Sequence, residues 1–133
     1  MDTYFDKIYI INLKESTDRK KTIDEQMVKF GITNYVFEQA ISGKDINLDE
    51  FKNNNLWAYP GNSICNINCS CTGKGHELHI NQIALHSSHY NIWKDIIKND
   101  YNKCLILEDD CIFTENINFF EKIICDIPET WKM

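Results

Sequence analysis

The sequence predicts an α/β domain in which a mostly parallel sheet is flanked by helices. The run from Lys7 to Leu13 combines β-branched and aromatic residues with little polar alternation, which is typical of a strand covered on both faces. A helical pattern and a second strand pattern follow it, and this order indicates a βαβ unit. A later apolar run, Cys104 to Leu107, is short enough for another buried strand of the same sheet.

The predicted βαβ unit has recognisable boundaries. Polar residues after the first strand turn the chain, and Ser16 or Thr17 can cap a helix that runs to about Phe30. Gly31 is expected to end this helix, because glycine readily adopts the left-handed conformation that closes a last helical turn. The segment from Asn34 to Ala40 then predicts a short second strand.

The rest of the chain is less regular. Residues 44–79 contain several asparagines and close cysteines, and they predict an irregular loop with one helical turn near Leu48 to Phe51. A helical stripe resumes from Ile80 to Ile97 and precedes the strand that starts at Cys104. Phe119 to Cys125 is expected to form a further short helix. The chain is therefore interpreted as one domain, residues 1–133, with an irregular Cys/His-containing loop.

Composition and charge limit the classes of function. With 133 residues, 43% of them hydrophobic and 26% charged, the chain can bury a core of its own. A net charge of −6 and a pI near 5.1 argue against nucleic acid or an anionic membrane as partner, because both require a basic surface. Charge interrupts the N-terminus, and no apolar run reaches the roughly 18 residues of a membrane helix. We therefore expect a cytoplasmic protein without a signal peptide or transmembrane segment. Abundant lysine, isoleucine and asparagine suggest an AT-rich genome, such as that of a large virus or a bacterium.

Three carboxylates, Glu108, Asp109 and Asp110, directly follow the predicted strand. Each like-charged pair about 5 Å apart costs roughly 3 kcal/mol at an effective dielectric constant of about 20, so such a cluster either holds protons or binds a cation. In an extended chain alternate side chains share a face, so Glu108 and Asp110 would point together and Asp109 away. Two carboxylates on one side suit a hard divalent ion that takes further ligands from a diphosphate. The alternative is a solvated acidic turn.

Four sequence blocks in a fixed order carry a more specific signal. They are Ile10-Ile11-Asn12-Leu13 with Asp18-Arg19, Ala40-Ile41-Ser42-Gly43, Ser88-His89 with Trp93, and Leu105-Ile106-Leu107-Glu108-Asp109-Asp110. Together they resemble glycosyltransferase family 25, which includes lipooligosaccharide glycosyltransferases and collagen galactosyltransferases. The resemblance extends over most of the chain.

The resemblance implies a GT-A-like fold with a Rossmann-type sheet. It also implies transfer of a sugar from a nucleoside-diphosphate sugar, expected to be a UDP-sugar, to a hydroxyl of a glycan, lipooligosaccharide, lipid-linked or protein acceptor. The expected cofactor is Mn²⁺, with Asp110 as its direct ligand and Glu108 and Asp109 beside it. The nucleotide-sugar site is expected to include Asn12, Leu13, Arg19, Ser42, Gly43 and His89.

Several of these roles have simpler alternatives. Arg19 is suited to pairing with a phosphate, and the alternative is that it merely caps a surface. Ser42 and Gly43 would let the backbone approach the donor closely, or could form a simple turn. His89 could hydrogen-bond the donor or be a structural histidine.

The sequence departs from the family pattern in two places. A glutamate of the family pattern is replaced by Gln82, which puts acid chemistry at that position in doubt. The chain also ends at Met133, where the family pattern continues into its acceptor-binding half. The catalytic base that deprotonates the acceptor is therefore expected beyond Met133. A non-catalytic, truncated remnant on the same fold is the main alternative.

The irregular loop carries a second possible metal site. Its soft and borderline ligands are Cys65, Cys69, Cys71, His76 and His79. A structural Zn²⁺ ion needs four ligands in a tetrahedral arrangement, and this set could supply them. The spacing is irregular compared with paired Cys-x-x-Cys motifs, so free thiols or one disulfide remain alternatives. With zinc, the chain could also be an interaction module.

Overall fold

A computed structural model describes residues 2, 4–47, 64–65, 78–114, 122 and 126, with the backbone alone described at 64–65 and 78–79. This part of the chain forms an α/β domain of Rossmann type, as the sequence predicts. Its elements in chain order are β1 (Lys7–Asn12), α1 (Thr17–Lys29), β2 (Tyr35–Gln39), the 3-10 helix η1 (Gly43–Asp45), β3 (Ile64–Cys65), β4 (Leu78–His79), α3 (Ile80–Asn99) and β5 (Cys104–Glu108).

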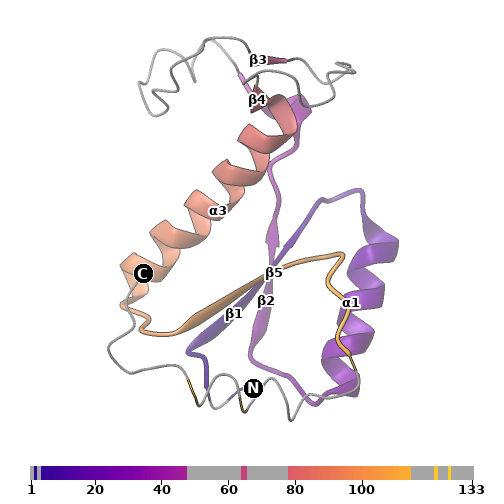
Figure 1. The fold of residues 1–133 in the computed structure, drawn as a ribbon, viewed down its shortest axis with the longest axis vertical. Helices are drawn as coiled ribbons and strands as arrows, with labels where there is room; N and C mark the ends of the chain where they lie inside the picture. The colour runs from indigo at the N-terminus through magenta and orange to yellow at the C-terminus, as the bar shows by residue number, and fades with distance from the viewer. Residues whose placement is uncertain are drawn as a thin grey trace.

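The three longer strands form one parallel sheet in the order β2-β1-β5. The central strand is β1, in which Ile10 lies opposite Phe37 of β2 and Leu107 of β5. Helices α1 and α3 lie on opposite sides of the sheet (Figure 1). The predicted first strand is thus covered on both faces, which explains why its sequence shows so little polar alternation.

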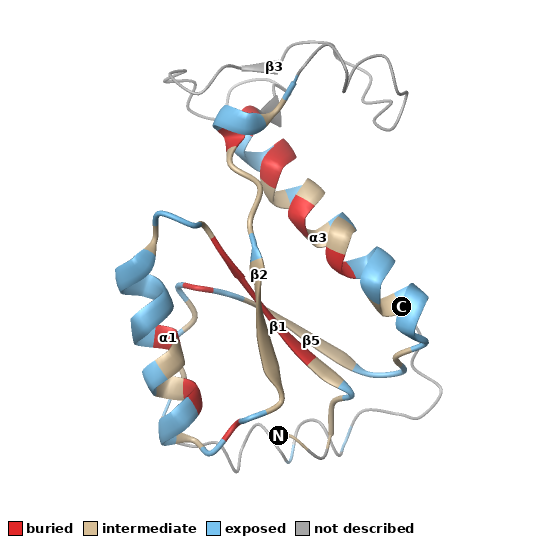
Figure 2. Cartoon of the chain, turned by 180° about the vertical axis from the view of Figure 1, so that it is seen from behind, coloured by how far each residue is buried: buried red, intermediate tan, exposed pale blue. Residues whose placement is uncertain are grey.

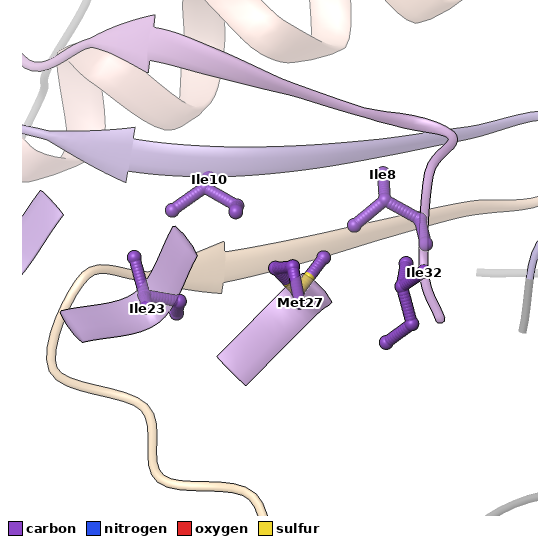
Figure 3. Packing of buried hydrophobic residues seen from close by; sticks show 5 residues of the cluster. All are labelled: Ile8, Ile10, Ile23, Met27 and Ile32. Carbon is purple, nitrogen blue, oxygen red and sulfur yellow. The ribbon is translucent and has the colours of Figure 1, made fainter. Parts of the chain in front are cut away.

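The face of the sheet toward α1 carries the larger cluster of buried residues. Successive side chains of a strand point to opposite faces, so Ile8 and Ile10 of β1 share this one. They pack against Ile23 and Met27 of α1 and against Ile32, and all five side chains are at most 2% exposed (Figure 3). The spacing of Ile23 and Met27 places both on one side of the helix.

The face toward α3 is built from the other residues of β1. Tyr9 and Ile11 pack against Ile92 of α3, and buried residues recur along both helices (Figure 2). The Tyr9 hydroxyl donates a hydrogen bond of 2.7 Å to Asp95 Oδ2, which fixes α3 to the central strand. Burial and this carboxylate raise the pKa of Tyr9 above its ordinary value, so the phenol stays a donor.

The ends of α1 agree only in part with the sequence prediction. Ser16 occupies the N-cap position, but its side chain makes no capping hydrogen bond. Its Oγ instead accepts from Arg19 Nη2 at 3.0 Å, so the predicted cap is wrong in its chemistry. Gly31 follows the helix with φ +66°, as predicted, and its amide donates to the carbonyl of Val28.

Of the remaining predicted helical segments, the structure describes one in full and the others only in part or not at all. The predicted helix from Ile80 extends to Asn99, and Asp100 closes it with φ 55°. The helical turn expected near Leu48 to Phe51 lies outside the described residues, as does the helix expected over Phe119 to Cys125 apart from Lys122. Among the helices that are described, none is long and apolar enough to cross a membrane.

Asp6 caps the amino end of the sheet, and its ionisation predicts how stability depends on pH. Backbone amides of Lys103 and Asn102 donate to its Oδ2 at 2.9 and 2.7 Å and lower the pKa of this carboxyl. A carboxyl with a lowered pKa stabilises the fold above its unfolded-state pKa and loses this contribution as pH falls through the folded-state value. We expect the free energy of unfolding to decrease from about pH 5 downward, and to decrease less steeply in Asp6→Asn. Urea unfolding at a series of pH values measures this, and equal slopes for the two proteins would contradict it.

Candidate functional site

A pocket of about 260 Å³ lies at the carboxyl-terminal edge of the sheet. The strands are parallel, so the segments that follow them meet at this edge, where open α/β sheets bind their ligands. One wall comes from β1, α1 and β5, and the other from the loop after β2 and the first half of α3. The described lining residues are Ile11, Leu13, Arg19, Ala40, Ile41, Ser42, Gly43, Asn81, Ala84, Leu85, Ser88, Glu108 and Asp109.

The end of β1 holds both walls through its backbone. The amide of Asp109 donates to the carbonyl oxygen of Ile11 at 3.1 Å, and the amide of Ala40 donates to that of Asn12 at 2.9 Å. The acidic segment and the loop after β2 are therefore fixed to the most buried strand of the domain. This arrangement positions the pocket rigidly, because the backbone of β1 is itself packed on both faces.

Asp109 lies in the polar centre of the site. Its side chain is 7% exposed, and its Oδ2 accepts a hydrogen bond of 2.6 Å from Asn12 Nδ2. Its Oδ1 forms an ion pair of 3.1 Å with Arg19 Nη1, although the Arg19 side chain is 48% exposed. Asn12 Nδ2 also donates to the carbonyl of Ser16 at 3.2 Å, so one buried amide joins the acidic segment to the start of α1. A buried carboxylate with two donors keeps one orientation.

Glu108 and Asp110 lie on either side of Asp109 and are exposed. The strand ends at Glu108, and the amide of Cys111 donates to the Glu108 carbonyl at 3.1 Å, which closes a turn. The expectation that Glu108 and Asp110 share a face assumed an extended chain, and the turn makes that assumption wrong. Glu108 lines the pocket with Asp109, whereas Asp110 is not among the described lining residues. We name residues 108–110 the acidic turn.

The opposite wall depends on the close approach of α3 to the loop after β2. Ser88 is 1% exposed, and its Oγ accepts from the amide of Ile41 at 2.9 Å and donates to the Ala84 carbonyl at 2.9 Å. A Cβ atom on Gly43 would overlap the Asn81 side chain and crowd that of Ile80. Glycine at position 43 thus allows the backbone to approach α3 closely. The close approach seen here is to another part of the protein.

The other expected site residues are placed as follows. Leu13 and Ser42 line the pocket, and Ser42 Oγ accepts from the amide of Lys44 at 3.3 Å. His89 is half-buried on α3 with its ring 6.2 Å from that of Trp93, and it is not among the described lining residues. Asn12 is not among the described lining residues, but its side chain hydrogen-bonds Asp109, which is. The roles expected for these residues in donor binding remain predictions.

The residues of the possible zinc site are described only in part. Cys69, Cys71 and His76 lie outside the described residues. The backbones of Cys65 and His79 lie opposite each other in the parallel pair β3-β4. Within the residues that the structure describes, no three His, Cys, Asp or Glu side chains gather to hold a metal ion, so the acidic turn does not supply three converging ligands. Zinc at the loop stays a prediction.

The helix α3 supplies lining residues that sequence reasoning missed. Asn81, Ala84, Leu85 and Ser88 recur at the spacing of one helical face. The small side chains of Ala84 and Ser88 were the available signal, since a helix that packs closely against a loop needs small residues at the contact. The sequence block Ser88-His89 points to this helix, but Ser88 and not His89 is among the described lining residues.

Comparisons with known proteins show which family the chain resembles. The model of the family described as "Glycosyltransferase family 25 (LPS biosynthesis protein)" matches residues 5–132. Human procollagen galactosyltransferase 2 is 31% identical over 113 residues, which are 82% of this chain and 16% of that protein. A glycosyltransferase 25 family member of Drosophila melanogaster is 28% identical, over 81% of this chain and 16% of that protein. Mouse inactive glycosyltransferase 25 family member 3 is 23% identical, over 84% of this chain and 18% of that protein.

No solved structure gives a significant match. The chain spans about one sixth of the length of the curated relatives it matches. The family match covers nearly the whole chain, including β1, α3 and the acidic turn. The chain therefore belongs to glycosyltransferase family 25.

Proposed function

We propose that this domain binds the nucleotide-sugar donor of a glycosyltransferase. The observation that carries the proposal is the pocket at the carboxyl ends of the strands, where Arg19 and two carboxylates meet. The transfer proposed for the enzyme moves a hexose from a UDP-sugar to a hydroxyl of a glycan, lipid-linked or protein acceptor. The human relative's name, procollagen galactosyltransferase 2, supports galactose as the first sugar to test.

The charges in the pocket suit a diphosphate only when a cation is also present. Glu108 and Asp109 would repel the phosphates. Among the described lining residues only Arg19 carries a positive charge, and it is already paired with Asp109. A divalent ion such as Mn²⁺ would offset this repulsion, and carboxylate oxygens are ligands that hard cations accept. When bound, the ion would neutralise negative charge that develops on the diphosphate leaving group.

Two exposed carboxylates of the acidic turn support the binding of such an ion. Both Asp109 oxygens are held by protein donors. The side chains of Glu108 and Asp110 are instead exposed and have no hydrogen-bond or ion-pair partner within the described part of the chain. We propose that Glu108 and Asp110 supply the ligands from the protein, and that Asp109 holds Arg19 at the edge of the donor site. Water and the diphosphate would complete the coordination.

The proposed transfer also needs a catalytic base. Attack by an acceptor hydroxyl requires a base, which must lie within hydrogen-bond reach of that hydroxyl. We expect this base in the acceptor-binding half of the enzyme. The domain described here would bind and orient the donor.

Titration calorimetry with UDP-galactose tests the proposal. We expect binding in the presence of MnCl₂ and at least about 10-fold weaker binding after its removal by a chelator. Asp110→Asn and Glu108→Gln should each weaken the manganese-dependent binding by about 10-fold or more. Asp100→Asn is a matched control, because it removes an exposed carboxylate at the far end of α3. If no UDP-sugar binds with manganese present, the donor-site proposal fails.

A non-catalytic role is the second candidate. The mouse relative named as inactive shows that family membership alone does not establish turnover. Binding of UDP-galactose without release of galactose or transfer to any acceptor would favour this role. Measuring released UDP alongside the calorimetry separates the two candidates.

A further inference from the structure

The acidic turn is held from α1 as well as from β1. Gln26, in the C-terminal half of α1, reaches the segment that follows the turn. Its Nε2 donates to the Cys111 carbonyl at 3.1 Å, and its Oε1 accepts from the Phe113 amide at 2.8 Å. One side-chain amide thus bonds an acceptor and a donor two residues apart, as a neighbouring strand would. The Gln26 side chain thus fixes the backbone of residues 111–113.

Apolar contacts fix the same segment in its register. Cys111 and Phe113 pack against the core cluster on the α1 side of the sheet, whereas Ile112 between them is 82% exposed. The Phe113 ring meets that of Phe30 edge to face, with centroids 5.7 Å apart. A shift by one residue would expose Phe113 and break both hydrogen bonds to Gln26. The segment therefore has one favoured position.

The geometry of α1 links this segment to the donor site. Arg19 and Gln26 are seven residues apart, which places them on the same side of the helix two turns from each other. Arg19 pairs with Asp109 inside the acidic turn, and Gln26 bonds the residues directly after it. The Cys111 amide also donates to the Glu108 carbonyl, so holding Cys111 holds the closing bond of the turn.

We propose that Gln26 is a positioning residue for the donor site. It acts through the backbone of Cys111 and Phe113, and sets the orientation in which Glu108 and Asp110 meet the cation and diphosphate of the donor. Gln26 is not among the described residues that line the pocket, so its effect is transmitted and not a contact with the ligand. The inference rests on the proposed donor-binding function.

Two variants that remove similar amides test this role. Asn34 Nδ2 also bonds two backbone groups, the carbonyls of Phe5 and Asp6, both at 3.0 Å, but it lies before β2 at the opposite edge of the sheet. Gln26→Ala should weaken manganese-dependent UDP-galactose binding by about 10-fold. Asn34→Ala should bind the donor like the unmodified chain, although both variants lose a pair of hydrogen bonds and some stability.

Amide hydrogen exchange gives a second readout that does not depend on ligand. The Phe113 amide should exchange faster in Gln26→Ala and at the unmodified rate in Asn34→Ala, relative to global unfolding. Gln26→Met, which keeps side-chain length and helix propensity, serves if the alanine variant does not fold. Unchanged exchange at Phe113, or unchanged donor affinity in a Gln26 variant, overturns the inference while the proposed function stands. Absence of donor binding in the unmodified chain overturns both.

Discussion

Replacing Asp109 with alanine is expected to weaken donor binding by about 100-fold and to lower the free energy of unfolding by about 2 kcal/mol. The substitution removes the acceptor of the Asn12 amide, which is 6% exposed and loses its 2.6 Å bond. It also releases Arg19, but at 48% exposure this side chain regains water, so its loss of pairing adds little to the change in stability. Donor binding should weaken more than stability, because Arg19 loses the ion pair that positions its charge and the pocket wall loses the hydrogen bond between Asn12 and Asp109.

The isosteric variant Asp109→Asn separates the two effects. Its side-chain oxygen can still accept from Asn12, so the free energy of unfolding should stay within about 1 kcal/mol of the unmodified value. It cannot hold the Arg19 guanidinium as a charge partner, so donor binding should still fall by about 10-fold. Calorimetry with UDP-galactose and manganese, combined with urea unfolding, measures both quantities. Unmodified affinity in Asp109→Asn would show that the ion pair does not organise the site.

The sheet could be predicted because its central strand is buried on both faces. An apolar run such as Lys7 to Leu13, with almost no polar alternation, is typical of a strand in this environment, and Gly31 marks the end of the following helix by its conformation alone. The absence of a capping bond from the Ser16 side chain could not be predicted in the same way. Its hydroxyl has two competing partners, and the position of Arg19 in three dimensions decides between them.

The sequence motifs predict which segments form the candidate site, but they do not predict how its side chains are oriented. Sequence reasoning placed the acidic residues at a strand end, but the exact residue where the strand ends decides which carboxylates point together. Because β5 ends at Glu108, Asp109 turns toward Asn12 and Arg19. The wall formed by α3 depends on contacts between residues far apart in the chain, such as Ser88 with Ile41, which no local pattern reveals.

Met27→Ala is expected to lower the free energy of unfolding by about 3 kcal/mol, with little effect from Val28→Ala. Both residues lie in α1, and Met27 packs against Ile10 and Ile23 (Figure 3). Met27 is 0% exposed, whereas Val28 is 69% exposed. Truncating a buried methionine costs about 2–5 kcal/mol, because apolar contacts are lost and a cavity remains. Truncating an exposed valine usually changes stability by about 0.5 kcal/mol or less, and alanine is the better helix former. Since domains of this size are stable by only about 5–15 kcal/mol, the first change should also shift the melting temperature clearly. Urea and thermal unfolding measure the pair, and equal losses for the two variants would mean that α1 does not pack on the sheet through Met27.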